Sequence, residues 1–541
     1  MNAVPRTCCR HQGLIVAILL AASVTAPADQ SLLTPSSRAT TRRGGEARLA
    51  VIGFASPRDA DERDVWLPVA FEELLVRRLR HVPGVRVAPT MRLYQGRSEL
   101  HDPRRDPPPW PVVIRGLGLD YWVSGSCRGP EFAVEVELTL RRLCTPQQLT
   151  SGTTLPPGRL FDNLDAATRW ILEELGVGDL PAALTERVFG KPCRSPTAIE
   201  YYARALMAAR ANKTEDALRY ASQCVASDPL FRPGLAMLAQ TEVPLGPSGR
   251  GSAARRLRAL SELAAREGDM LDRARAEIGL SLISQSEGAF EAACKRAENA
   301  LCWSFEQDDL YGQMAALTAL ADAHLTRPLP LAPALPPEAR ERFIRQNMRV
   351  AADWQEVLVD LLYEMEDRIG ALPAVNKLAL IYERLGEGEA ALRMHERTLT
   401  LATELDSPRH QATAWLYLGQ WYRDRQRWQE ALDATARCLA LADDDAKAAV
   451  RIVLGSVYQS MGRHEESLGQ FELAYEQARR NEDLLNQYTC LREIAAVRLK
   501  LGQRDLAISA LQEAIDLAHV LELREEQRLR QDLEKWKSGG G

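Results

Sequence analysis

The nearest approach to a catalytic motif in this sequence is the run from Gly125 to Gly129 (GSCRG), which has the spacing of a nucleophile elbow with Cys127 as the nucleophile. A thiolate in that position could attack an acyl group. The elbow needs a strand that turns directly into a helix, whereas Pro130 and a further strand-like stretch follow here. We therefore interpret the run as a strand end whose glycines allow a tight turn. A hydrolase that uses Cys127 is the alternative hypothesis.

A second glycine-rich run, from Gly246 to Ser252 (GPSGRGS), has the composition of a phosphate cradle, and Arg250, Arg255 and Arg256 could supply positive charge. It lacks a preceding strand and a following lysine, so we predict a loop between helices. The eight histidines never stand four residues apart, as the helical zinc-binding motif requires. These patterns indicate neither nucleotide nor zinc chemistry.

Adjacent carboxylates are the remaining candidates for acid–base chemistry. Glu72 and Glu73 stand in a helical stretch, and Asp443 to Asp445 stand in a predicted loop. Such runs are usually solvated, because a charged carboxylate loses its favourable hydration on burial. We interpret both as exposed surface. The sequence predicts no catalytic residue, no cofactor and no metal site, and hence a protein that is not an enzyme.

Composition and charge describe a folded protein of several structural units. Of the 541 residues, 26% are charged and 46% are hydrophobic, which is the balance of a globular chain. Lys and Arg together number 68 against 73 Asp and Glu, which gives a net charge of -5. This charge provides no general attraction to nucleic acid or to anionic lipid, so we expect no nucleic-acid partner.

The first residues have the composition of a secretory signal peptide. Basic residues precede the apolar run from Gly13 to Ala26, and small residues before Asp29 form a cleavage-like site. We predict a signal peptide over residues 1–28, a flexible leader over residues 29–46, and an exported protein, periplasmic or extracellular, without stable membrane insertion after cleavage. No cysteine stands where a lipoprotein would be modified. An uncleaved anchor is the alternative, although the run is short for about 30 Å of hydrocarbon.

Eight cysteines follow the predicted signal peptide, at positions 127, 144, 193, 224, 294, 302, 438 and 490. None of them forms a CxxC pair, so their spacing does not indicate a metal framework. Several occupy positions where a small apolar residue would pack between helices, and a free thiol commonly serves as such a residue. We predict buried thiols rather than disulfides.

Residues 47–180 alternate between strand-like and helix-like stretches, which predicts a small α/β domain. An apolar run from Leu49 to Phe54 predicts the first strand, and the leucines of the stretch from Trp66 to Arg80 fall on one helical face. Alternating apolar residues predict further strands near residues 85–87, 121–124 and 132–138, and helical spacing returns over residues 161–175. We interpret the proline-rich stretch 103–111 as a loop that interrupts this domain.

An ordered set of short segments in this domain resembles the TolB amino-terminal-like domain. The segments that carry the resemblance are Leu49 to Phe54 (LAVIGF), Gly84 to Val87 (GVRV), Gly118 to Ser126 (GLDYWVSGS) and Leu160 to Asp162 (LFD). The TolB-like domain is found in bacterial envelope and regulatory proteins, often just ahead of tetratricopeptide repeats. The resemblance implies a docking or assembly module. The proline-rich insertion and the lack of a tryptophan in residues 150–155 depart from the pattern of that family.

Internal repetition dominates the rest of the chain. The small residues Ala379, Gly419, Gly455 and Ala495 recur at intervals of 40, 36 and 40 residues. Turn positions follow in the same register, at Gly386, Gln426, Gly462 and Gly502. Trp415, Leu418, Gly419 and Tyr422 match the W-x-x-L-G-x-x-Y pattern of the tetratricopeptide repeat. Each such hairpin can bury its apolar face only against the next one, so the repeats predict a stack.

We therefore predict a mainly α protein in which the small α/β domain precedes an α-solenoid of tetratricopeptide-type helical hairpins. The hairpins are irregular over residues 196–357, with pairs near 197–229 and 272–303, and regular over residues 358–520; residues 521–541 form a capping helix and tail. A coiled coil is the structural alternative. It fails because Gly or Pro breaks the helices about every dozen residues and no heptad spacing is sustained.

The outward positions of the first helices in a solenoid are not needed for the fold, so they are available for a partner. The predicted groove residues are Asn376, Glu383, Arg384, Gln420, Arg423, Asp424, Ser456, Gln459, Arg492 and Lys500. Their mixture of amides, a hydroxyl and both charges suits recognition of a protein segment or peptide.

These observations favour an exported protein–protein interaction scaffold, with the α/β domain as a docking module and the repeats as a groove for a protein segment. The alternative is a signalling sensor or adaptor. Such a protein would keep the apolar run as a membrane anchor and bind a ligand or partner through the α/β domain. The sequence leaves the identity of the partner and the oligomeric state open.

Overall fold

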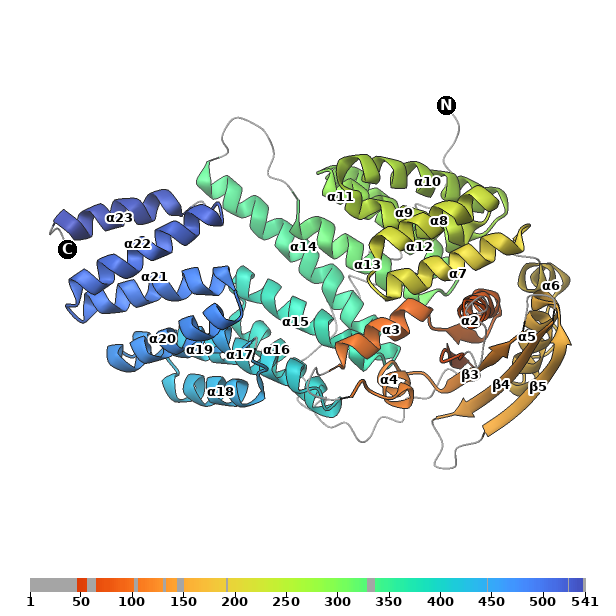
Figure 1. Ribbon diagram of the computed structural model, residues 1–541, viewed down its shortest axis with the longest axis horizontal. Coiled ribbons are helices and arrows are strands. Elements are labelled where there is room, and N and C mark those ends of the chain that lie inside the picture. The colour runs from red at the N-terminus through yellow and green to blue at the C-terminus, as the bar shows by residue number, and fades with distance from the viewer. Residues whose placement is uncertain are drawn as a thin grey trace. The chain divides into compact units, whose positions relative to one another are not determined.

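The computed structural model describes residues 46–55, 65–101, 106–129, 133–143, 150–190, 193–327, 336–444, 446–523 and 525–538. These residues form two compact units, whose elements are labelled in Figure 1. Unit 1 consists of the described parts of residues 1–93 and 119–330, and unit 2 of those of residues 94–118 and 331–541. The predicted signal peptide lies outside the described residues, as does the predicted leader apart from Glu46.

Unit 1 begins with a mixed sheet of five strands. The strands are β1 (Ala47–Val51), β2 (Val85–Val87), β3 (Tyr121–Arg128), β4 (Val134–Arg142) and β5 (Thr150–Gly158). Their order is β2-β1-β3-β4-β5; β1 is parallel to both neighbours, and the β3-β4-β5 part is antiparallel. Alternate residues of β4, from Val134 to Leu140, are buried. This alternation confirms the half-buried strand predicted from the sequence.

Two helices supply much of the apolar surface that covers this sheet. Helix α2 (Leu67–Leu79) buries Phe71, Leu75 and Leu79 completely, and α5 (Leu160–Glu174) buries Leu164 and Ile171. Both helices share one apolar core with the strands. The helices predicted over residues 66–80 and 161–175 are thus confirmed, and the N-terminal region is a small α/β fold.

The rest of unit 1 consists of helices. They are α6 (Ala182–Phe189), α7 (Pro196–Arg210), α8 (Thr214–Ser227), α9 (Arg232–Glu242), α10 (Gly246–Arg266), α11 (Met270–Ser286), α12 (Phe290–Glu306) and α13 (Leu310–Leu325). Helices α7 and α8, α9 and α10, and α11 and α12 pack as successive hairpins. The pairs predicted near residues 197–229 and 272–303 are confirmed, and α9 with α10 forms a pair that the sequence did not indicate.

The glycine-rich run from Gly246 to Ser252 was predicted to be a loop, and this prediction is wrong. The run is the first part of α10, directly after the 3-10 turn Val243–Leu245. A β-carbon at Gly249 would come within 2.1 Å of the Glu242 carbonyl oxygen. Gly249 therefore allows α9 (Arg232–Glu242) and α10 to meet at close range. The glycine in this run serves helix packing and not phosphate binding.

Unit 2 consists mainly of hairpins that follow one another along the chain. Its helices after residue 331 are α14 (Pro337–Glu364), α15 (Arg368–Leu385), α16 (Gly388–Glu404), α17 (Pro408–Asp424), α18 (Trp428–Leu441), α19 (Lys447–Ser460), α20 (His464–Arg480), α21 (Leu484–Lys500), α22 (Arg504–Val520) and α23 (Glu526–Ser538). Each packs against its neighbours in the chain, and α23 packs on α22 as the predicted capping helix. The α-solenoid predicted for this region is confirmed.

A segment from the N-terminal region belongs to unit 2. Residues 94–118, which include most of α3 (Thr90–Glu99) and all of α4 (Trp110–Gly116), form a compact unit with residues 331–541. A β-carbon at Gly118 would lie 2.2 Å from the Met365 carbonyl oxygen, so only glycine fits there. The sequence-based division instead placed these residues in the α/β domain, with the proline-rich stretch 103–111 as an interrupting loop.

The repeat register predicted from the sequence holds in unit 2. Turn residues Gly386, Gln426, Gly462 and Gly502 all have left-handed backbone, with φ of 80°, 59°, 76° and 75°. The small residues Ala379, Gly419, Gly455 and Ala495 are all buried. A β-carbon on Gly455 would come within 2.8 Å of the Phe471 ring. Residue size at this position therefore sets how closely the two helices of a hairpin approach.

Gly455→Ala is expected to destabilise unit 2 by about 1–3 kcal/mol, because the fully buried Phe471 ring cannot move aside. The control is Gly469→Ala in α20, where a β-carbon would meet nothing within 4 Å. That change gains only helix propensity and should stabilise by roughly 0.5–1 kcal/mol. Urea denaturation of both variants measures the difference; equal midpoints would contradict the close-packing assignment.

Candidate partner-binding surfaces

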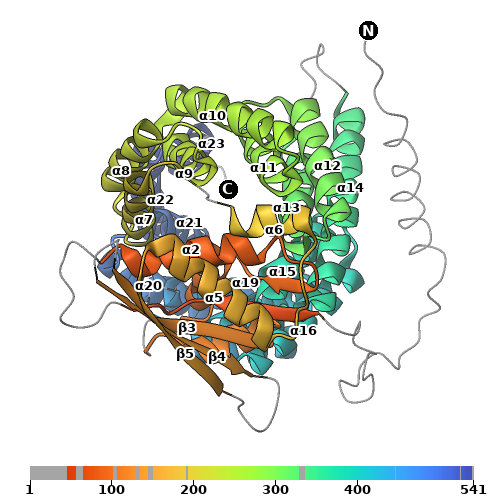
Figure 2. The same ribbon diagram turned by 90° about the vertical axis from the view of Figure 1, so that its right-hand side faces the viewer.

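The first helix of each hairpin is here called the A helix. In unit 1, helices α7 to α13 follow an arc, and α2 lies across its inner side (Figure 2). Helix α2 packs directly on α7. Its C-terminal end reaches Asp272 of α11 and Asp309, the residue before α13, through Arg77 and Arg80. The inner side of the first array therefore holds a helix of the same chain.

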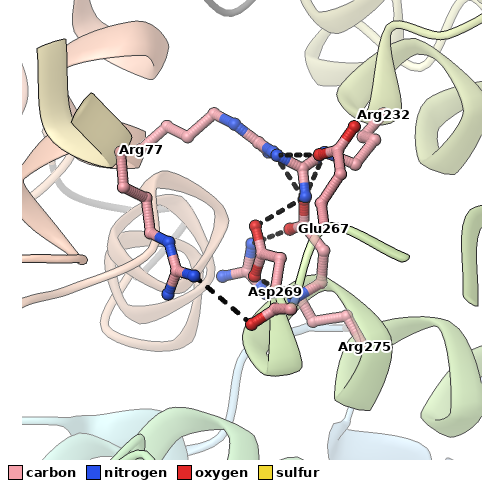
Figure 3. A network of polar contacts seen from close by, with 8 residues as sticks. Arg77, Arg232, Glu267, Asp269 and Arg275 are labelled. Carbon is pink, nitrogen blue, oxygen red and sulfur yellow. Dashed lines mark hydrogen bonds and ion pairs between the residues drawn. The ribbon is translucent and has the colours of Figure 1, made fainter. Parts of the chain in front are cut away.

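A network of charges joins α2 to this array (Figure 3). The Arg77 guanidinium bonds the Asp272 carboxylate, which also lies 3.4 Å from Arg232. Arg232 in turn contacts Asp269 at 2.6 Å and Glu267 at 3.3 Å. Four of these five side chains are at most 20% exposed, so solvent screens their attraction only in part.

Burial and neighbouring charges shift the pKa values of the groups in and beside this network. Burial would raise the pKa of Asp272, but nearby Arg77, Arg275 and Arg232 hold it well below its usual range. Burial, together with repulsion from Arg275, lowers the pKa of Arg80 to about 10. Burial also lowers the pKa of His81 to about 4, so this imidazole is neutral at physiological pH. The acids and guanidiniums compensate one another.

Apolar packing reinforces the same contact. The core that contains Phe71 of α2 continues without interruption to Ile199 and Ala203 of α7, Cys224 of α8 and Phe231. These residues are at most 1% exposed. Because α2 is held by both a shared core and ion pairs, the first array and the α/β fold are one structural body.

In unit 2 the predicted groove residues lie as the register requires. Asn376, Glu383 and Arg384 are on α15; Gln420, Arg423 and Asp424 on α17; Ser456 and Gln459 on α19; and Arg492 and Lys500 on α21. These four helices are the A helices of successive hairpins, and none of the ten residues is buried.

Several of these side chains already have partners within the chain. His395, which is buried against Tyr417, donates from Nε2 to Glu383 at 2.9 Å. Arg423 pairs with the adjacent Asp424, and Arg492 pairs with Glu493. The Ser456 hydroxyl donates to the Ile452 carbonyl of its own helix.

The other predicted residues are uncommitted. Arg384, Gln420, Gln459 and Lys500 make no side-chain hydrogen bond or ion pair with any described residue. They belong to four consecutive A helices. Two amides and two cations thus follow one another along one array. These groups can form hydrogen bonds and ion pairs with a polar protein segment.

A cleft of about 440 Å³ lies at the α15 end of this surface. Its lining residues are Gln95, Ser98, Glu99, Leu372, Pro373, Asn376, Thr398, Arg409, His410 and Thr413. The buried Asn376 Oδ1 accepts no hydrogen bond from a described residue, and the Arg409 side chain has no described partner. Glu99 already has a polar interaction of its own. The repeat register predicts Asn376 but not the α3 side of the cleft, because α3 lies far away in the chain and outside the repeats.

Cys127 does not stand in a nucleophile elbow. It lies in β3, which continues to Arg128 and pairs antiparallel with β4, the next element among the described residues. The thiol is 2% exposed, and burial raises its pKa far above the usual range, with Glu72 adding to the effect. The hydrolase hypothesis is therefore contradicted. The seven cysteines in the described ranges are free thiols, all buried except the half-buried Cys302, which confirms the predicted buried thiols.

Among the described residues, no three His, Cys, Asp or Glu side chains are grouped so that they could hold a metal ion. Every helix in the described ranges is too short or too polar to pass through a lipid bilayer.

Comparison with known proteins agrees with the fold of unit 2. Residues 371–444 and 446–518 match the tetratricopeptide repeat family. No curated protein matches the chain. The family match covers the regular hairpins from α15 to α22, so these are tetratricopeptide repeats, which are typically non-catalytic protein-interaction modules. The resemblance of the N-terminal domain to the TolB family stays a prediction.

Several solved structures are similar to parts of this chain. BtubC from P. vanneervenii is 19% identical, with 43% of this chain and 91% of that chain covered and a TM-score of 0.36. A signal-transduction ATPase with a tetratricopeptide repeat sensor from Pyrococcus horikoshii is 13% identical, with 71% and 57% covered and a TM-score of 0.45. A Rap protein in complex with the competence and sporulation factor is 12% identical, with 70% and 94% covered and a TM-score of 0.36.

Removing one partner of the Arg77–Asp272 pair is expected to cost about 3 kcal/mol of unfolding free energy, because the remaining charge stays buried. Arg77→Met and Asp272→Asn should each destabilise, and the double variant should lose less than the sum of the two. The control, Arg219→Met, breaks an exposed pair with Asp216 and should change stability by at most about 0.5 kcal/mol. Urea denaturation provides the measurement, and additive effects would show that the pair is not coupled.

Proposed function

We propose that the protein is a non-enzymatic scaffold that binds a protein segment along the A helices α15, α17, α19 and α21. The observation that carries this proposal is the contrast between the two arrays. The inner side of the first array is bound to α2, whereas Arg384, Gln420, Gln459 and Lys500 on the second have no described side-chain partner. The second array is therefore the one available to another protein.

The chemistry of this surface favours an extended segment with polar groups. Primary amides such as Gln420 and Gln459 both donate and accept hydrogen bonds, so each can meet a peptide group of the bound chain. Neighbouring helices lie about 8–10 Å apart, which spaces these amides at roughly three residues of extended backbone. Arg384 and Lys500, on the first and last A helices of the set, add cations at both ends.

The cleft beside α3 extends the same surface. A buried acceptor without a donor costs about 1–3 kcal/mol, so the unpaired Asn376 Oδ1 favours a ligand that brings an N–H group. Arg409 offers an uncommitted cation at the same place. We therefore place one end of the bound segment in this cleft, beside Asn376 and Arg409.

Simultaneous Arg384→Glu and Arg423→Glu substitutions are expected to abolish capture of the partner by the full chain. Two reversed charges on adjacent A helices repel acidic groups that the two arginines of the wild type attract. The thermal unfolding midpoint should stay within about 2 °C, since both changes are on the surface. Capture is measured by chemical crosslinking and mass spectrometry in the native host.

The matched control reverses two arginines on second helices of unit 2, Arg393 on α16 and Arg480 on α20, both of which are exposed. This variant has the same net charge as the first and should capture the partner as the wild type does. Equal capture by all three proteins would rule out the A helices as the binding surface.

We propose further that the chain is exported and that the α/β fold is a docking module. Export is supported by the basic residues, apolar run and small residues that precede Asp29. The protein isolated from the native host is expected to begin near Asp29 and to occur outside the cytoplasm. N-terminal sequencing of each cell fraction tests this, and a product that starts at Met1 in the membrane fraction would favour the anchored sensor instead.

A further inference from the structure

Two adjacent carboxylates and one guanidinium meet where α2 packs on α7. Arg210, the last residue of α7, places Nη2 3.0 Å from Glu73 Oε1 and 3.5 Å from Glu72 Oε1. The side chains of Glu72, Glu73 and Arg210 are 4%, 15% and 14% exposed. The sequence-based interpretation of Glu72 and Glu73 as solvated surface is therefore wrong. They belong to the joint that holds α2 against the first array.

The groups around this joint do not neutralise both carboxylates. The Gly53 amide donates to Glu72 Oε2 at 3.1 Å, and the Thr90 side chain lies beside Glu73. The charged and titratable groups that face the pair from the packed elements are Arg210 and Tyr202 of α7, Arg275 of α11 and Cys127 of β3. Burial raises the pKa of Tyr202 and of Cys127 far above neutrality, so neither ionises here. Arg210 is the only one of these cations in direct contact with the carboxylates in the described structure.

Burial is the dominant effect on both acids. It raises the pKa of Glu72 from its ordinary 4.5 to about 8, although Arg210 acts in the opposite direction. It also raises the pKa of Glu73. Two buried carboxylates beside one cation retain a proton at neutral pH, because the second negative charge would be neither hydrated nor paired.

We propose that Glu72, Glu73 and Arg210 form a proton-dependent latch between α2 and α7. The latch is closed while the two carboxylates share one proton and one guanidinium. Loss of the proton leaves an uncompensated charge in the joint, which is relieved when α2 separates from α7 and water enters. Opening uncovers the inner side of the first array, so proton concentration controls access to a surface that α2 otherwise occupies.

The direction of the pH dependence follows from the raised pKa. The folded state binds the proton more tightly than the unfolded chain, so the stabilisation is complete below pH 4.5 and is lost as the pH rises through about 8. His81, with a pKa near 4 and an ordinary value of 6.5, titrates mainly below this window, and Arg80, near 10, titrates above it. Between pH 6.5 and 8 the change belongs chiefly to the Glu72–Glu73 pair.

Amide hydrogen exchange of the full chain tests the latch. Between pH 6.5 and 8, protection of α2 and α7 in the wild type should fall about tenfold after correction for the intrinsic exchange rate. Glu72→Gln imitates the protonated acid, and its protection should not change over this range. The control is Glu200→Gln, which alters a half-exposed acid of α7 paired with Arg204 and should retain the wild-type pH dependence.

An infrared measurement on the wild type keeps the test independent of any variant that fails to fold. A protonated carboxylic acid band should be present at pH 6.5, should fall to about half its strength at pH 8 and should be lost at still higher pH. The proposal is overturned if this band is missing at pH 6.5, or if Glu72→Gln shows the same loss of protection as the wild type. The latch is also excluded if Glu200→Gln, like Glu72→Gln, shows no loss of amide protection between pH 6.5 and 8.

Discussion

A single two-helix hairpin cannot bury its apolar face by itself, and this constraint shapes most of the molecule. Each hairpin must lean on the next, and close approach requires small residues where helices cross, as at Gly419 and Gly455. A sharp reversal must follow at a fixed distance, which is why Gly386 and its equivalents have left-handed backbone. Small residues at the helix crossings and left-handed turn residues therefore recur together along unit 2.

The same constraint leaves an inner side on every array, and the two arrays use it differently. In the first array, α2 packs on α7 and shares an apolar core with it through Phe71. The charged end of α2 is matched by Asp272 and Asp309, so its burial there is compensated. That array functions as a support for the α/β fold.

In the second array, uncommitted amides and cations line successive A helices, and α3 adds a wall to the cleft around Asn376. The helices that carry these side chains are already ordered by hairpin packing, so binding would not require ordering of their backbone. The two arrays thus differ: the first is bound to α2, whereas Arg384, Gln420, Gln459 and Lys500 of the second have no described side-chain partner.

The features that could be predicted from the sequence are those whose contacts join residues close together in the chain or related by the repeat. The hairpins, their register and the A-helix positions of Gln420 or Lys500 were accessible from the sequence, because a repeat recurs every 36 to 40 residues and its packing partners are its neighbours. The strands and helices of the α/β fold were accessible through their local periodicity.

Tertiary structure alone decided which surfaces stay open. Arg77 meets Asp272 across 195 positions and Glu73 meets Arg210 across 137, and such pairs leave no periodic trace in the chain. For the same reason the sequence placed Glu72 and Glu73 in solvent and residues 94–118 in the α/β domain. The sequence alone predicts that a carboxylate is exposed, because only the folded structure brings the compensating charge of a distant residue beside it.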